Sequence, residues 1–254
     1  MFTKLKEHGF LFSELVKRDF KKKYKRTYLG MLWSVLSPLL TLLVMSLVFT
    51  GFFGNDIPHY TIYIFCGNIV FSFFNDASNG GMQSLLSNSA IFTKINVPKY
   101  LFLFSRNVSS LINFALTFVV FILFCIIDRI PITPLFISLL IPIVLLVIFN
   151  LGVGLILSAM FVFFRDVQYL WSVFTMLLMY MSAIFYDVSR FEQYKNLFYL
   201  NPVYVYIKYF RDVVLNAVFP SMELNLLAVG YALLFFGIGA IIYKKCNHKF
   251  LYYV

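Results

Sequence analysis

The sequence predicts an all-α integral membrane protein with six transmembrane helices, and its composition and apolar periodicity support this fold class. Hydrophobic residues make up 61% of the 254 positions, charged residues only 13%, and the mean hydropathy is +0.84. A soluble domain needs more charged surface, so many apolar side chains must face lipid. Stretches of roughly 20 apolar residues, enough to span a bilayer, recur between short polar breaks.

These stretches define one membrane domain over residues 1–254. We expect spans at about 31–53, 60–81, 101–127, 135–163, 167–187 and 224–243. The second span is the least regular, because it ends in the polar sequence FFNDASNGG.

Residues 1–30 form a basic segment before the first span. Within residues 10–28, Phe12, Val16, Phe20 and Tyr24 recur at every fourth position, with charged residues on the other faces. This spacing predicts an amphipathic helix that lies flat on the inner leaflet. The run KKKYKR resembles a nucleic-acid-binding patch in isolation, but such a cluster beside a span favours anionic lipid headgroups. The net charge of +10 therefore requires no nucleic-acid partner.

The distribution of lysine and arginine predicts the orientation. With the N-terminus inside, 15 of the 21 basic residues fall on the cytoplasmic side and five on the other, while Arg106 lies within the third span. Cytoplasmic loops retain an excess of basic residues. Both termini are therefore expected in the cytoplasm of a multi-pass protein.

Polar residues within the first three spans fall on single helical faces, because they are spaced by three or four. Such stripes should turn away from lipid, toward a substrate path or a neighbouring helix, and both roles stay open. Asp76 and Arg106 could also pair with each other. The candidate path residues are Ser34, Ser37, Asn68, Ser72, Asn75, Asp76, Asn79 and Arg106.

The chain carries no recognisable catalytic chemistry. A GxxxxGK[ST] phosphate loop is absent from the sequence, so the chain has no nucleotide site of that kind. The three histidines and three cysteines are scattered, without the spacing of a metal or redox site. We expect no metal, cofactor or catalytic residue in this chain.

Residues 188–223 are expected to form short re-entrant helices on the outer side. Asn201 and Pro202 predict a helix start, with asparagine as the cap and proline in the first helical position. Aromatic rings suit sliding contacts with sugars, although anchoring at headgroups is the simpler explanation for any one ring. The candidate exit aromatics are Tyr186, Tyr204, Tyr206 and Tyr209.

The loop from Gln83 to Tyr100 is the longest cytoplasmic stretch between spans. Ser87 or Asn88 could cap a short helix whose apolar face would fit a groove on a partner. The residues expected to couple to that partner are Ile91, Phe92, Lys94, Ile95 and Pro98, with Ile91 and Phe92 as anchors.

Four segments together resemble the type-2 ABC exporter permeases for O-antigen, capsule, teichoic acid and related glycans. They are RDFKKKYKRTYLGMLWSVLSPLL, IFTKINVPKYLFLFSR, FRDVQYLWSVFTMLLMYMSAIFYD and LNPVYVYIKYFRDVVL. The resemblance implies a bacterial cytoplasmic-membrane homodimer with two copies of a separate ATPase, which would hold ATP and Mg. Closure of the ATPases would act through the loop from Ile91 to Lys99, and a lipid-linked glycan would pass between the permeases.

One departure concerns the outer lip, where Phe185, Tyr186 and Asp187 are not followed by the proline that many relatives have. Two alternatives also remain open. A type-2 permease for a lipid or drug often has a large outer domain or a different entry helix. A membrane-embedded enzyme acting on lipid-linked glycans needs several carboxylates or histidines at a membrane face, whereas Asp76 is the only carboxylate clearly inside an expected span.

Overall fold

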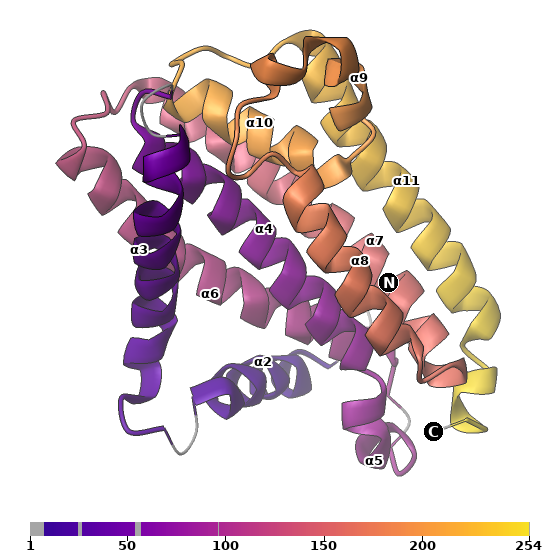
Figure 1. Cartoon of the computed structure of the whole chain (residues 1–254). Helices are drawn as coiled ribbons and strands as arrows, with labels where there is room; N and C mark the ends of the chain where they lie inside the picture. Colours follow the sequence, from indigo (N-terminus) through magenta and orange to yellow (C-terminus); the bar gives the residue numbers. More distant parts are fainter. Residues whose placement is uncertain (1–7, 25–26, 54–56, 96, 254) are drawn as a thin grey trace.

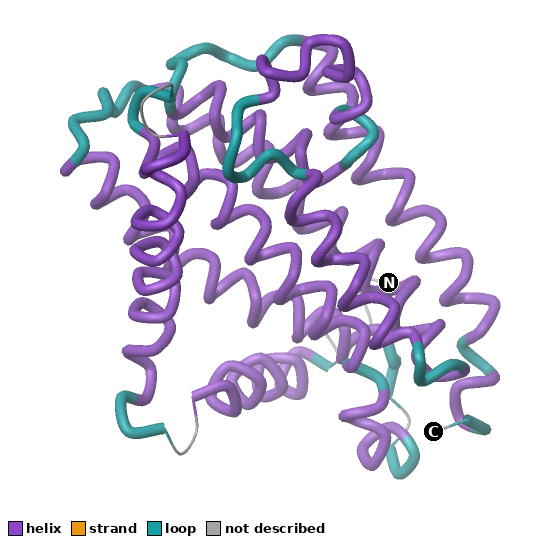
Figure 2. The backbone as a smooth tube through the Cα atoms, in the orientation of Figure 1, coloured by secondary structure: helices purple, strands orange, loops and turns teal. Residues whose placement is uncertain are grey.

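The computed structural model describes residues 8–24, 27–53, 57–95 and 97–253, and every regular element within these ranges is a helix (Figures 1 and 2). All six apolar stretches form helices close to the expected bounds. They are α3 (Trp33–Phe53), α4 (Tyr60–Gln83), α6 (Tyr100–Ile127), α7 (Leu140–Phe163), α8 (Val167–Met181) and α11 (Met222–Cys246).

Four of these helical segments are long and apolar enough to cross a membrane: α3, α6, α11, and α7 together with the preceding 3₁₀ turn η3 (Pro134–Leu139). Helix α4 does not meet that criterion, and α8 has only 15 residues. The span expected at 167–187 is therefore longer than the helix, which ends at Met181. Ala183 then takes a left-handed conformation, with φ 50°, which does not continue an α-helix.

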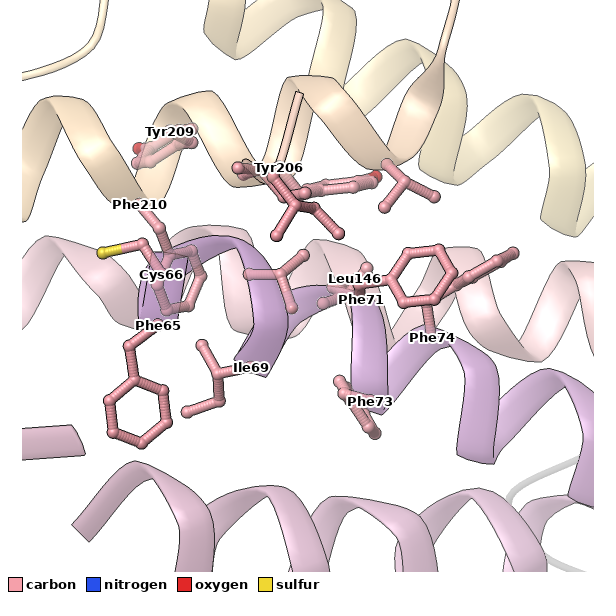
Figure 3. Close-up of a cluster of buried hydrophobic side chains, with 14 of the residues drawn as sticks. Phe65, Cys66, Ile69, Phe71, Phe73, Phe74, Leu146, Tyr206, Tyr209 and Phe210 are labelled. Carbon is pink, nitrogen blue, oxygen red and sulfur yellow. The ribbon is translucent and has the colours of Figure 1, made fainter. Parts of the chain in front are cut away.

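Helix α4 forms the centre of the bundle and packs against α3, α6, α7 and α10 (Pro202–Val214). Most of its side chains are buried, and Figure 3 shows its rings between neighbouring helices. Phe74 stacks against Phe149 of α7, with ring centroids 5.8 Å apart. A Cβ added to Gly81 would lie 3.0 Å from the Cα of Gly154, so small residues let α4 and α7 approach closely.

The two ends of the bundle differ in character. Helix α2 (Gly9–Tyr24) lies across one end, near α5 (Ser89–Phe92), and the C-terminus lies at this end too (Figure 1). The helix expected over residues 10–28 is confirmed, although it ends at Tyr24. This end also carries the 3₁₀ turns η2 (Leu86–Asn88) and η5 (Lys249–Leu251), while η1 (Gly30–Leu32) leads into α3.

The opposite end holds η4 (Val188–Tyr194), α9 (Lys195–Phe198) and α10. Short helices in residues 188–223 are confirmed. So is the predicted start of α10, because the Asn201 side chain accepts a 3.0 Å hydrogen bond from the Val203 N–H and Pro202 opens the helix.

Candidate functional site

Polar residues of three helices face a common cavity of about 420 Å³ between α3, α4 and α6. Each helix contributes a stripe with members three or four positions apart, a spacing that keeps side chains on one face. The stripes are Ser34, Ser37 and Thr41 on α3, Asn68, Ser72 and Asp76 on α4, and Ser110, Asn113 and Thr117 on α6. Nine polar side chains from three helices therefore line one space.

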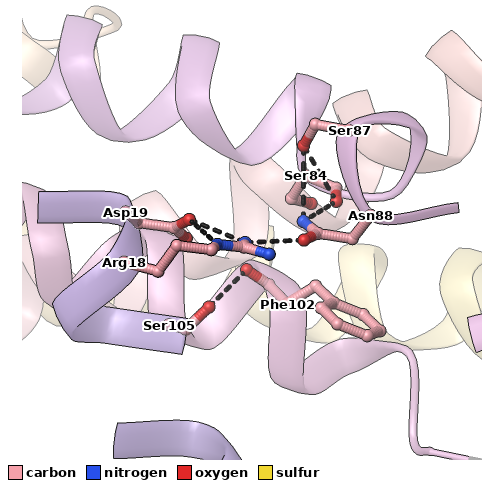
Figure 4. Close-up of polar contacts among 7 residues, drawn as sticks. All are labelled: Arg18, Asp19, Ser84, Ser87, Asn88, Phe102 and Ser105. Atoms are coloured by element: carbon pink, nitrogen blue, oxygen red, sulfur yellow. Dashed lines mark hydrogen bonds and ion pairs between the residues drawn. The ribbon is translucent and has the colours of Figure 1, made fainter. Parts of the chain in front are cut away.

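A second polar cavity, of about 540 Å³, lies between α2, the C-terminal end of α4 and α6. Arg18 of α2 bridges two elements at its edge, as Figure 4 shows. Its Nη2 atom donates to Asp19 Oδ1 at 2.7 Å and to Asn88 Oδ1 at 2.6 Å. The amphipathic helix is thereby fastened to the loop that follows α4. The lining residues are Arg18, Asp19, Gly80, Gln83, Ser84, Ser87, Asn88 and Arg106.

Asp76 and Arg106, which the sequence offers as a pair, line different cavities. Asp76 accepts a 3.4 Å hydrogen bond from Asn113 Nδ2. The Arg106 side chain lies over Gly80, so a Cβ at that position would collide with it. Sequence reasoning gave Gly80 no role, yet its missing side chain makes room for the guanidinium group.

Asn75 and Asn79 differ from the other candidate path residues of α4, because they lie outside the two polar cavities. Asn79 Nδ2 donates to the Asn75 carbonyl oxygen at 2.9 Å and to Asn75 Oδ1 at 2.8 Å. In the described part of the chain, neither residue lines either of the two polar cavities. Because they lie outside both cavities, these two asparagines are weaker path candidates than Asn68, Ser72 and Asp76.

The prediction for the loop from Gln83 to Tyr100, here called the coupling loop, needs a correction at Phe92. This ring was expected as an exposed anchor, but it is only 6% exposed and packs against Phe102, with centroids 6.0 Å apart. Ile91 is half-buried against the same cluster. Among the residues expected to couple to a partner, Lys94 and Ile95 are exposed, and Ile95 is 57% exposed.

Asn88 occupies the expected cap position before α5, but its side chain makes no cap hydrogen bond. Its Nδ2 atom instead donates to the Ser84 carbonyl oxygen at 2.7 Å, while its Oδ1 atom accepts from Arg18. The predicted cap position is therefore right, but the predicted hydrogen bond to the helix N-terminus is wrong, because the Asn88 side chain bonds to Arg18 of α2 and to Ser84 instead.

Lys99, next to Pro98, joins the coupling loop to the C-terminal end of α11. Its Nζ atom donates to the Asn247 carbonyl oxygen at 2.7 Å and lies 5.8 Å and 5.7 Å from the ring centroids of Phe92 and Phe250. Partial burial lowers the pKa of Lys99, because a less hydrated site disfavours the charged form. A displacement of the coupling loop would thus be transmitted to α11 through the Lys99 contact.

The exit aromatics need a correction as well. Tyr206 and Tyr209 are fully buried, and their hydroxyl groups donate to the Ala228 carbonyl oxygen at 2.9 Å and to Asn225 Oδ1 at 3.1 Å. Both tyrosines therefore fasten α10 to α11. Tyr204 is buried among Val188, Phe198 and Tyr199.

Tyr186 is the one candidate exit aromatic that borders an apolar groove in the described structure. Its hydroxyl donates to the Tyr180 carbonyl oxygen at 2.8 Å. The groove has about 250 Å³ and is lined by Met181, Tyr186, Phe191, Tyr194, Leu197, Phe198 and Asn201.

Side chains from α4 and α10 stabilise the non-helical stretch after α8. Arg211 Nη1 donates to the Ala183 carbonyl oxygen at 2.9 Å, and Nη2 donates to that of Ile184 at 3.0 Å. Tyr60 and Tyr63 donate to the carbonyl oxygens of Phe185 and Tyr186 at 2.8 Å and 2.7 Å. Four successive carbonyl groups thus find partners in side chains instead of in a helix.

Comparisons with known proteins agree with this architecture. The ABC-2 type transporter family matches residues 11–215. The chain is 28% identical to the O-antigen export system permease protein RfbA of Klebsiella pneumoniae, with 95% of each chain covered. It is 30% identical to RfbA of Myxococcus xanthus over 72% of this chain and 70% of the relative. It is 24% identical to the polysialic acid transport protein KpsM of Escherichia coli, with 92% of each covered.

Proposed function

Because this chain belongs to the ABC-2 type transporter family, we propose that it is the permease subunit of an ATP-driven exporter of a lipid-linked polysaccharide. Relatives that cover nearly the whole chain are named as O-antigen and polysialic acid transport proteins. These matches extend over 92–95% of both chains, which supports the same class of cargo here.

We place six spans in the cytoplasmic membrane, with α4 and α8 added to the four long apolar segments. Helix α4 is polar along one face but buried among its neighbours, so it can cross the bilayer without exposing that face to lipid. The end with α2, α5 and the C-terminus is the cytoplasmic one, supported by its basic residues.

The cavity between α3, α4 and α6 carries the proposal for the path. The nine polar side chains from α3, α4 and α6 offer hydroxyl, amide and carboxylate groups, which suit a hydrated glycan and are costly to place against lipid. The second cavity, with Arg106 and Arg18, extends the polar surface toward α2. The apolar groove around Tyr186 would receive the glycan at the outer end.

A second copy of this chain and two copies of a cytoplasmic ATPase would complete the exporter, with ATP and Mg bound by the ATPase. The exposed residues Lys94 and Ile95 favour the loop after α4 as the contact with the ATPase. Lys99 would carry motion from this loop to α11.

Replacement of Ser72 by leucine tests the path. Ser72 lines the cavity, and a leucine side chain would narrow it and remove a hydroxyl group. We expect glycan export to fall at least about tenfold, equivalent to about 1.4 kcal/mol on the rate-limiting barrier. The readout is glycan at the cell surface, measured with co-purification of the ATPase.

Asn79→Leu is the matched control, because Asn79 lies on the same helix but outside the two cavities. It should leave export near the unmodified rate. Unchanged export in a Thr41→Leu, Ser72→Leu double variant would assign the polar stripes to helix packing.

A further inference from the structure

A groove of about 880 Å³ at the α2 end of the bundle shares no lining residue with the two polar cavities. It lies between α6, α7 and α11 and is closed by the loop before α6. Its volume falls near the top of the range for pockets that hold small molecules, about 300 to 1,000 Å³. Of the residues that line this groove, only Lys99 has a role in the proposed function.

The groove changes from apolar to cationic along its length. On α11, Phe236, Ala240 and Lys244 follow one another at four-residue intervals, so they share one face over about 12 Å. On α6 the order is the same, because Lys99 precedes the helix and Phe104 lies more than one turn inside it. Both walls therefore place a ring deep in the groove and a lysine at its mouth.

The positive charge at the mouth lacks a carboxylate partner. The described lining residues include no aspartate or glutamate. The Lys99 ammonium group contacts the Asn247 carbonyl oxygen and the rings of Phe92 and Phe250, none of which carries a negative charge. Lys244 is exposed and forms no ion pair within the described part of the chain.

Tyr243 supplies a second, independent observation. This residue lines the groove and is only 6% exposed, and its hydroxyl group has no hydrogen-bond partner among the described residues. A buried hydroxyl without a partner is costly, and a polar ligand atom or a water in the groove would satisfy it.

We propose that this groove binds one anionic phospholipid of the bilayer. Its phosphate would lie between Lys99 and Lys244, and an acyl chain would follow Phe104, Phe236 and Ala240. Basic pockets between membrane helices bind anionic headgroups in this manner. A phospholipid matches both parts of the groove, because it carries an anionic headgroup and apolar acyl chains. The bound lipid would join the coupling loop to α11 beside the Lys99 contact.

Site-specific crosslinking tests the proposal with the full-length chain in vesicles of phosphatidylglycerol and phosphatidylethanolamine. A photoreactive benzoylphenylalanine at Phe236 should capture phosphatidylglycerol about fivefold above its share of the vesicle, since one lysine contributes about that factor. The same probe at Leu233, an exposed α11 residue outside the groove lining, should capture both lipids in proportion to the vesicle.

Two matched pairs of variants separate charge from space. Lys244→Gln should abolish the enrichment, whereas Lys245→Gln should not, because Lys245 is exposed but outside the lining. Ala240→Trp should lower the total lipid captured at Phe236, whereas Ile241→Trp on the outer face should not. Enrichment that survives Lys244→Gln, or crosslinks at Phe236 to protein instead of lipid, would overturn the proposal.

Discussion

At the scale of single residues, Arg211 shows what long-range geometry adds to the sequence. Its position in the outer helix and the asparagine cap of that helix were predictable from local pattern. Its partners were not, because they lie on segments 27, 28 and 148 residues away. Arg211 is 7% exposed, and its guanidinium group lies 3.5 Å from the Tyr63 ring centroid and donates to three carbonyl oxygens.

Replacing Arg211 by methionine should destabilise the protein by about 3–5 kcal/mol, because carbonyl groups in a buried stretch would lose a charged donor. Arg211→Lys should recover only part of the loss, since a single amine cannot reproduce the planar fork. The measurement is the thermal unfolding midpoint in detergent. Lys208→Met is the control on the same helix. Its partly exposed ion pair with Asp212 is worth at most about 1 kcal/mol, and an equal fall in both variants would refute the assignment.

At the scale of elements, the sequence predicted the helices better than the direction in which their rings face. Apolar runs locate α3, α6, α7 and α11 because lipid and the helix core both accept apolar side chains. For the same reason, hydrophobicity cannot distinguish a core ring from an exposed one. The burial of Phe92, Tyr206 and Tyr209 depends on which helix lies beside them. Polar stripes do carry a direction, and five of the eight candidate path residues line the cavity between α3, α4 and α6, namely Ser34, Ser37, Asn68, Ser72 and Asp76.

The loop after α4 now offers a sharper test of coupling. Ile95→Ser should weaken co-purification of the ATPase by about 30-fold, because truncating an interface anchor costs about 2 kcal/mol. Phe92→Ala should instead lower the unfolding midpoint, since a buried ring is lost from a packed cluster. Ile132→Ser changes an equally exposed isoleucine before η3 and serves as the control. Normal ATPase binding with Ile95→Ser would exclude Ile95 as the anchor.

At the scale of the whole molecule, the asymmetry of basic residues predicts the orientation in the membrane. Cys246 would first be replaced by serine, while Cys66 and Cys125 are buried. In spheroplasts, a membrane-impermeant maleimide should label Lys195→Cys at once and Lys17→Cys only after lysis, because both positions are exposed at opposite ends. The reverse pattern would mean that the molecule is inverted.

The shortness of α8 has a consequence for how this part of the chain would cross a membrane. Its 15 residues rise by about 22 Å, whereas the hydrocarbon core of a bilayer is about 30 Å thick. The proposed span therefore needs the non-helical stretch after α8 to cover the remaining thickness, and there the carbonyl groups of residues 183–186 accept hydrogen bonds from Arg211, Tyr60 and Tyr63. A short helix followed by a hydrogen-bonded irregular end would thus cross a bilayer of ordinary thickness without the lipid having to thin around it.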